Sequence, residues 1–191
     1  FPAYVKRQQA YFEQKNGQGI IDDFYECIRL YPPYVKPYVL AYKTFYFYRQ
    51  YEDAAGIWKR AEEAGLKSDE MQLYRYKIRR LTETGQENWQ KLLGEVIKFK
   101  DQYFAKKNDP ENEEECDIED EAELYMEIGL LYWNLDDLNA AMRTVEEGIH
   151  KCGKKNNLIW LKADLLMDQN KHADALHFYR KVVANEPDNA N

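Results

Sequence analysis

The sequence lacks the features of a membrane protein and of a disulfide-rich secreted domain. No uninterrupted apolar run approaches the roughly 18 to 20 residues of a membrane-spanning helix, and the mean hydropathy is −0.80. The three cysteines, Cys27, Cys116 and Cys152, are odd in number and far apart, which is not the pattern of a disulfide framework. We therefore expect no membrane span and a reducing compartment, the cytoplasm.

A basic excess is also missing. The 191 residues carry a formal net charge of −7, whereas binding to a nucleic-acid backbone usually needs a basic stripe. Residues 59–107 differ, with twelve basic against eight acidic side chains, so an RNA-binding helical repeat stays as a less favoured alternative. The overall charge favours a protein or peptide partner.

The sequence does have strong helical periodicity. Its 45% hydrophobic and 15% aromatic residues suffice for a core. Apolar residues recur three and four positions apart, turn-forming residues separate these stretches, and no alternating strand pattern competes. The pattern predicts ten helices, over residues 3–15, 19–31, 36–49, 52–64, 69–84, 87–106, 119–134, 138–151, 157–169 and 172–184.

An acidic segment interrupts this periodicity. Ten of the sixteen residues from Asn108 to Glu123 are Asp or Glu. Pro110 and the charge density predict a solvated connector in the first half, with docking of a basic peptide as the alternative. The second half, "DIEDEAELY", is typical of a helix start, because carboxylates are favoured at the positive end of the helix dipole.

A 34-residue period explains the spacing of small and large side chains. Two consecutive windows, from Ala122 and from Asn156, place a small residue at positions 8 and 20 and a large one at positions 11 and 24. Small side chains let two helices approach closely, and the large ones fill the space beside that contact. These positions hold Gly129, Ala141, Tyr132 and Val145 in the first window, then Ala163, Ala175, Leu166 and Tyr179 in the second.

Earlier windows follow the same order with some departures. The window from Val35 has Ala54 at position 20 and Trp58 at position 24, and the window from Phe1 has Ile20 and Phe24. Gln8 and Tyr42 replace the small residue at position 8, so we expect these two hairpins to be splayed or to cross at a different angle. The window from Asp69 fits only after a one-residue slide that aligns Trp89, Leu93 and Val96, which predicts an irregular turn near Gly85.

This pattern resembles the tetratricopeptide repeat family. The resemblance implies an all-α, right-handed superhelical solenoid of about five antiparallel helix hairpins with one acidic insertion. Residues 1–102 would form three repeats, the third irregular, residues 103–121 a helix extension and acidic connector, and residues 122–191 two further repeats. Each hairpin would leave an apolar face that only the next one covers.

Both ends of the sequence suggest a longer protein. Residue 1 is Phe, so we expect a fragment or a processed form. The ending "NEPDNAN", with Pro187, resembles the family's lead into another helix. We expect the array to continue or to have been cut at a repeat boundary.

The resemblance also implies a concave groove lined by positions 2, 5, 9, 12 and 13 of the first helices. In the alternative interpretation, Trp133 and Trp160 at these positions only pack between neighbouring hairpins. The implied peptide-binding residues are Val39, Lys43, Tyr46, Met126, Leu130, Trp133, Trp160, Asp164 and Met167, flanked by Phe47, Asn134 and Asp168. Exposed aromatic residues commonly anchor interfaces, and Lys43 and the aspartates could fix the direction of a peptide.

Repeats that clamp the carboxylate tails of heat-shock chaperones need particular lysines and asparagines in this groove. The corresponding places hold Val5, Gln9 and Leu40, then Glu123, Met126 and Glu127. The sequence argues against such a clamp.

No residue pattern points to catalysis, a metal or a cofactor. The stretch "GIHKCGKK" (residues 148–155) has the glycine spacing of a phosphate-binding loop, but no Ser or Thr follows its lysine and a helix precedes it. His150, His172 and His177 lack the i, i+4 partner of a helical metal site. We predict a non-catalytic adaptor or scaffold that binds a peptide or helical segment, with a structural subunit of a larger assembly as the alternative.

Overall fold

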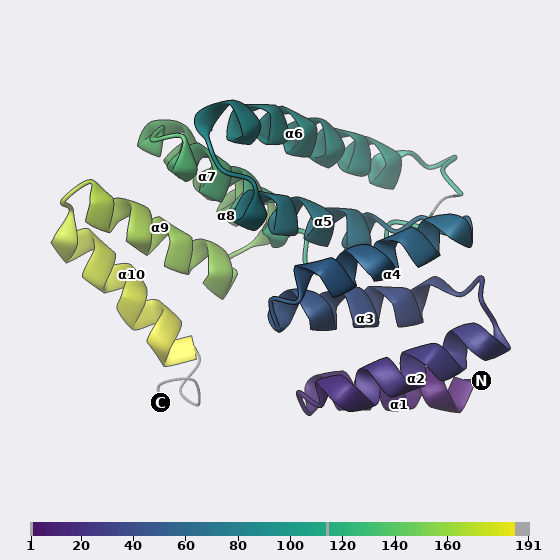
Figure 1. Cartoon of the computed structure of the whole chain (residues 1–191). Coiled ribbons are helices and arrows are strands. Elements are labelled where there is room, and N and C mark those ends of the chain that lie inside the picture. Colours follow the sequence, from purple (N-terminus) through teal and green to yellow (C-terminus); the bar gives the residue numbers. More distant parts are fainter. Residues whose placement is uncertain (1, 114, 186–191) are drawn as a thin grey trace. The chain divides into compact units, whose positions relative to one another are not determined.

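The computed structural model describes residues 2–113 and 115–185, and every regular element in these residues is an α-helix (Figure 1). The predicted all-α class and the order of the helices are confirmed. Helix α7 begins at Ala122 rather than at Glu119. The helices are α1 (Pro2–Glu13), α2 (Gly17–Leu30), α3 (Val35–Phe47), α4 (Tyr51–Glu63), α5 (Asp69–Thr82), α6 (Gln86–Asn108), α7 (Ala122–Asn134), α8 (Leu138–Cys152), α9 (Asn156–Asp168) and α10 (His172–Asn185).

The chain divides into two compact units. Unit 1 comprises Phe1–Ile78 with Glu115–Ile118, and unit 2 comprises Arg79–Glu114 with Glu119–Asn191. In unit 1, α1 pairs with α2 and α3 with α4, and α3 also packs against α1 and α2. In unit 2, α7 pairs with α8 and α9 with α10, while α6 packs on α7 and α9 contacts both α7 and α8. Each unit therefore contains two of the predicted helix hairpins.

Four hairpins share one turn, and its spacing supports the 34-residue period. The left-handed residues Lys15, Arg49, Asp136 and Asn170 have φ values between 56° and 63° and stand at position 15 of their windows. In each turn the amide of the next residue donates to the carbonyl at position 11, at 2.8 to 3.0 Å. This bond satisfies a carbonyl at the end of the first helix.

The third window departs from this turn. Gly85, at φ 97°, directly precedes α6, and the Trp89 indole donates to the Glu83 carbonyl at 2.9 Å. Helix α5 contains no Gly, Ala or Ser that would allow a close helix–helix contact. It contributes the large side chains of Met71 and Tyr74 to the core of unit 1. The turn is irregular near Gly85, as the sequence predicts.

Small residues at the predicted positions lie at the centre of the hairpins. Ala54, Ala141, Ala163 and Ala175 are fully buried. A Cβ atom added to Gly148 would lie 2.6 Å from the Cβ of Tyr125. The close approach of α7 and α8 therefore requires a residue without a side chain at this point.

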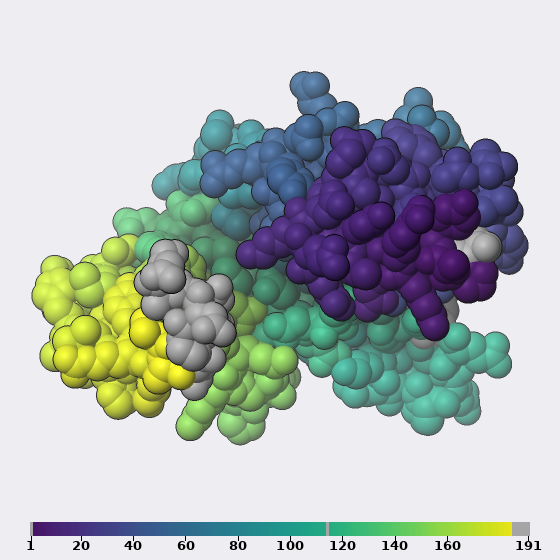
Figure 2. All heavy atoms as spheres, turned by 90° about the horizontal axis from the view of Figure 1, so that it is seen from below, coloured from purple at the N-terminus to yellow at the C-terminus, as the bar shows by residue number. Residues whose placement is uncertain are grey.

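The first hairpin is not splayed, although Gln8 replaces a small residue. Gln8 is fully buried, and its amide donates to the carbonyls of Ile20 at 3.1 Å and Pro37 at 3.2 Å. The side chain thus satisfies backbone groups of two neighbouring segments. Figure 2 shows this hairpin in purple, with no other described residue of unit 1 in front of its outer side.

The described residues in the first half of the acidic segment, including Pro110, are largely exposed as predicted, whereas the second half corrects the prediction, because α7 begins only at Ala122. Asp117 accepts hydrogen bonds from the Ser68 hydroxyl at 2.6 Å and the Glu70 amide at 3.0 Å, while Ser68 accepts from the Met71 amide at 3.1 Å. Ile118 beside it is buried. The Asp117 carboxylate therefore stabilises the N-terminus of α5. It was expected at the N-terminus of α7, the helix that follows it in sequence.

Within the described ranges, no helix is long and apolar enough to cross a membrane. Pro187 and the sequence around it lie outside these ranges, so the predicted lead into another helix stays a prediction.

Candidate functional site

An aromatic cluster covers the first-helix face of unit 1. Phe47 lies 6.1 Å from Phe12, 5.4 Å from Tyr46 and 6.1 Å from Tyr74, measured between ring centroids. Tyr46 and Tyr74 meet edge to face at 4.9 Å. Phe47 is nevertheless 60% exposed, so its ring is held by its neighbours and still presented to solvent.

Two lysines lie beneath these rings. The Lys43 ammonium is 2.9 Å from the Glu70 carboxylate, 5.5 Å from the centre of the Phe12 ring and 5.4 Å from that of Tyr74. Lys77 lies 4.2 Å from the Tyr74 ring. Lys43 is only 5% exposed and Val39 only 8%. Lys43 and Val39 therefore pack inside unit 1. Lys43 supports the rings by ion pairing and cation–π contact and does not reach a groove.

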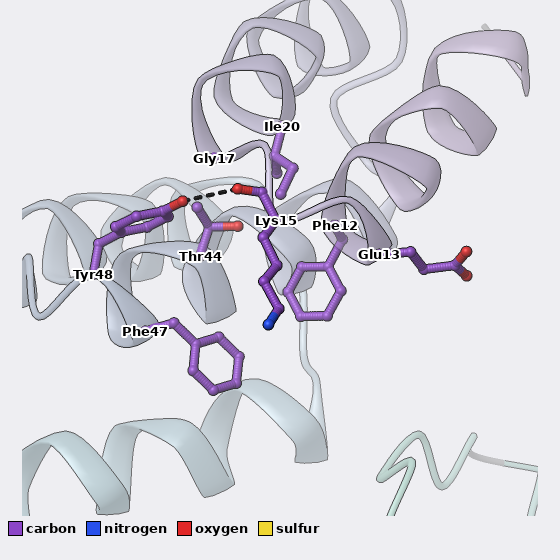
Figure 3. A pocket seen from close by; sticks show the side chains of 8 residues that line it. All are labelled: Phe12, Glu13, Lys15, Gly17, Ile20, Thr44, Phe47 and Tyr48. Carbon is purple, nitrogen blue, oxygen red and sulfur yellow. Dashed lines mark hydrogen bonds between the residues drawn. The ribbon is translucent and has the colours of Figure 1, made fainter. Parts of the chain in front are cut away.

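An open cavity of about 500 Å³ adjoins this cluster (Figure 3). Helix α1 and its turn contribute Phe12, Glu13 and Lys15, the start of α2 contributes Gly17 and Ile20, and the end of α3 contributes Thr44, Phe47 and Tyr48. A volume of this size falls within the range of about 300 to 1,000 Å³ that is typical of ligand pockets.

The Tyr48 wall of this cavity depends on a glycine. A Cβ atom at Gly17 would stand 2.5 Å from Cε2 of the Tyr48 ring, so only glycine lets the ring lie against the start of α2. The Tyr48 hydroxyl donates to the Lys15 carbonyl at 3.0 Å (Figure 3). Two separate contacts therefore fix the position of this ring.

In unit 2 the predicted residues divide into packed and exposed side chains. Met126, Leu130 and Trp133 are half-buried against the core of α7, α8 and α9. Trp160 is 43% exposed and Met167 41%. The two exposed side chains both belong to α9, so this helix presents most of the apolar surface predicted for the unit.

The two predicted aspartates of unit 2 are engaged by neighbouring side chains. The Trp133 indole donates to Oδ2 of Asp168 at 2.6 Å, and the Tyr179 hydroxyl donates to Oδ1 of Asp164. Burial, with the hydrogen bond to Asp164, raises the pKa of Tyr179 to about 12. Both carboxylates therefore orient a ring as well as adding negative charge.

The described residues show no group of three or more His, Cys, Asp or Glu side chains that could hold a metal ion. The three histidines are exposed. Burial raises the pKa values of the Cys27 and Cys152 thiols, which disfavours the reactive thiolate form.

Residues 122–149, which form α7 and most of α8, match the tetratricopeptide repeat family. One helix hairpin of this chain therefore matches the tetratricopeptide repeat family. Its fold is similar to that of PilF from Pseudomonas aeruginosa, with a TM-score of 0.66, 11% identity, and coverage of 96% of this chain and 75% of PilF. No curated protein matches the sequence.

The fold is also similar to that of YrrB, described as a tetratricopeptide repeat protein with an unusual peptide-binding site. The TM-score is 0.51 at 12% identity, and the match covers 97% of this chain and 86% of YrrB. At such identities the likeness concerns the fold alone.

The sequence did not predict the cavity of unit 1. Gly17 and Gly19 lie at the start of α2, and a Cβ atom at either would collide with an aromatic ring, of Tyr48 or of Tyr11. A glycine pair at a helix start beside several aromatic residues was the available signal. It indicated close ring packing without locating a pocket.

Proposed function

We propose that this protein is a non-catalytic adaptor of the tetratricopeptide repeat type, which binds a peptide or helical segment of another protein through the faces of its first helices. One observation carries the proposal. Phe47, Trp160 and Met167 stand at the groove positions of the family pattern and are 60%, 43% and 41% exposed. Large exposed apolar side chains at such positions are typical of interface anchors.

The remaining predicted residues have supporting roles in this proposal. Tyr46, Met126, Leu130 and Trp133 would extend the apolar surface around the exposed anchors, and Asp164 would add negative charge. The buried residues Val39 and Lys43 would not contact the partner but would hold the aromatic rings of unit 1 in place. YrrB, with its peptide-binding site, offers a precedent on the same fold.

The alternative is a structural subunit of a larger assembly. It draws support from second-helix faces, where Tyr25 and Leu176 are each 48% exposed and Val183 is 57% exposed. A protein held through many surfaces would use these residues as well. The two proposals therefore differ in whether second-helix residues matter for partner capture.

The partner is proposed to be a protein rather than a nucleic acid. Unit 1 has twelve basic and twelve acidic residues, and the rest of the chain has 15 and 22, so the net charge of −7 belongs to unit 2. Such a unit repels phosphates. A chaperone-tail clamp is not proposed, because the groove lacks its lysines and asparagines. The three free cysteines suit a reducing compartment such as the cytoplasm.

Capture of partners from native lysate by two matched variants tests the proposal. Trp160→Ala removes an exposed ring on a first helix, and Leu176→Ala removes an equally exposed apolar side chain on a second helix. We expect Trp160→Ala to lose a partner that Leu176→Ala retains, with helicity by circular dichroism unchanged in both. Equal loss would favour the structural subunit, and loss of helicity with Trp160→Ala would mean that Trp160 is a core residue.

A further inference from the structure

The cavity of unit 1 has an apolar interior, and both hydroxyl groups on its walls already donate hydrogen bonds to the backbone. Phe12, Ile20, Phe47 and the Tyr48 ring supply carbon surface. The Thr44 hydroxyl donates to the Leu40 carbonyl at 2.8 Å, and the Tyr48 hydroxyl donates to the Lys15 carbonyl at 3.0 Å. A polar group placed inside would lose its bonds to water without replacement. The occupant is therefore apolar.

The edge of the cavity carries one positive charge. Figure 3 shows the Lys15 side chain running between Phe12 and Phe47, whereas the Glu13 side chain points away from these rings. Among the described residues, the Lys15 ammonium has no ion-pair partner. An anionic group next to the apolar body would meet this ammonium, and a cationic group would be repelled.

The position of the cavity connects it to the proposed interface. Phe12 and Phe47 occupy positions 12 and 13 of their windows, which face the groove in the family pattern. The Phe47 ring both forms a wall of the cavity and reaches solvent. A segment lying along the first helices would therefore pass the opening, and one of its side chains could enter.

We infer that the cavity between Phe12, Ile20, Phe47 and Tyr48 is a side-chain pocket for a partner segment with a bulky apolar residue next to an Asp or Glu, whose carboxylate pairs with Lys15. The apolar residue fills the cavity and the carboxylate stays at its edge. This inference rests on the proposed function and names the chemistry of the partner that unit 1 selects.

Titration of the ¹⁵N-labelled full chain with three short peptides, followed by amide chemical shifts, tests the pocket. The peptides consist of Ala and Gln around a central Phe-Glu, Phe-Lys or Ala-Glu pair. We expect the Phe-Glu peptide to shift the amide signals of Gly17 and Thr44. It should bind about two- to fivefold tighter than the Phe-Lys peptide, as one exposed ion pair allows. The Ala-Glu peptide should leave both amide signals unchanged.

Variants of Lys15 separate charge from fold. Lys15 has φ 56°, a conformation that Asn tolerates well, and Asn170 holds the equivalent place in the last hairpin. Lys15→Asn should abolish the preference for Phe-Glu, and Lys15→Glu should reverse it. Phe47→Ala should weaken both Phe peptides by about tenfold, while Val183→Ala, an equally exposed apolar change in unit 2, should have no effect.

Three results would overturn the pocket. Shifts confined to the Trp160 indole and its neighbours would refute it while leaving the proposed interface standing. Tighter binding of free laurate, with the same dependence on Lys15, would assign the cavity to a small amphiphile instead of a protein segment. No shift by the Phe-Glu peptide at about 1 mM would also refute it, and the Trp160→Ala capture would then decide the proposed function separately.

Discussion

Replacement of Gly148 by Ala tests the close approach on which the last hairpins depend. The new Cβ atom would lie 2.6 Å from Cβ and 2.9 Å from Cγ of Tyr125, and 3.0 Å from Cδ1 of Leu158. The Cβ of Tyr125 cannot move by a change of rotamer, and its ring is fully buried. Helices α7 and α8 must therefore separate to admit one methyl group.

Two opposing effects set the size of the change. Overpacking of a core typically costs about 1 to 3 kcal/mol, whereas Gly to Ala within a helix gains about 1 kcal/mol. Gly94→Ala in α6 provides the matched control, because a Cβ atom there would meet no atom within 4 Å. We expect Gly94→Ala to stabilise the protein, and the two variants to differ by about 1 to 3 kcal/mol in free energy of unfolding.

Urea unfolding monitored by circular dichroism measures this difference, with the slope m compared between the variants. The close contact of α7 and α8 predicts a lower free energy of unfolding for Gly148→Ala than for Gly94→Ala. If the two substitutions stabilise the protein equally, α7 and α8 are not in the close contact described, and the argument from small residues at the hairpin contact is wrong.

Three further predictions concern unit 1. Gly65→Ala forces φ 71° on a residue with a Cβ atom and should cost about 1 to 2 kcal/mol, whereas Gly56→Ala in the same hairpin should stabilise by up to about 1 kcal/mol; thermal unfolding that ranks them the other way would contradict the turn geometry. Asp117→Asn weakens the bonds to Ser68 and the Glu70 amide and should cost about 0.5 to 2 kcal/mol in urea unfolding; no loss would mean that the connector is free in solution. Burial raises the pKa of Tyr42 to about 12, above the value of about 10 in an unfolded chain. The stability that the neutral phenol contributes should therefore be complete below pH 10 and decline between pH 10 and 12. Tyr42→Phe should reduce this decline in the free energy of unfolding, and an unchanged pH profile would refute the burial argument.

The sequence predicted the helices well because their signals are local. Apolar spacing and turn residues located ten helices, and the period of small residues located the contact that involves Ala141 and Ala175. The 34-residue period reappears in the turn residues, from Lys15 to Arg49 and from Asp136 to Asn170. These features depend on neighbours within one or two hairpins.

The sequence could not predict features that join distant segments. Asp117 was expected at the start of its own helix but binds the start of α5, because a carboxylate is favoured at any nearby helix N-terminus. Lys43 has the right spacing for a groove residue, yet the Glu70 carboxylate holds it inside. The cavity of unit 1 follows from the packing of Tyr48 on Gly17, which belong to different hairpins. Such contacts require three-dimensional information.

Site-specific photo-crosslinking tests most directly whether the first-helix faces bind the partner. A photoreactive amino acid is placed at Met167 on α9 or, as the control, at exposed Arg143 on α8. We expect the partner to be crosslinked efficiently from Met167 and weakly or not at all from Arg143. Equal crosslinking from both positions, or crosslinking from Arg143 alone, would contradict it.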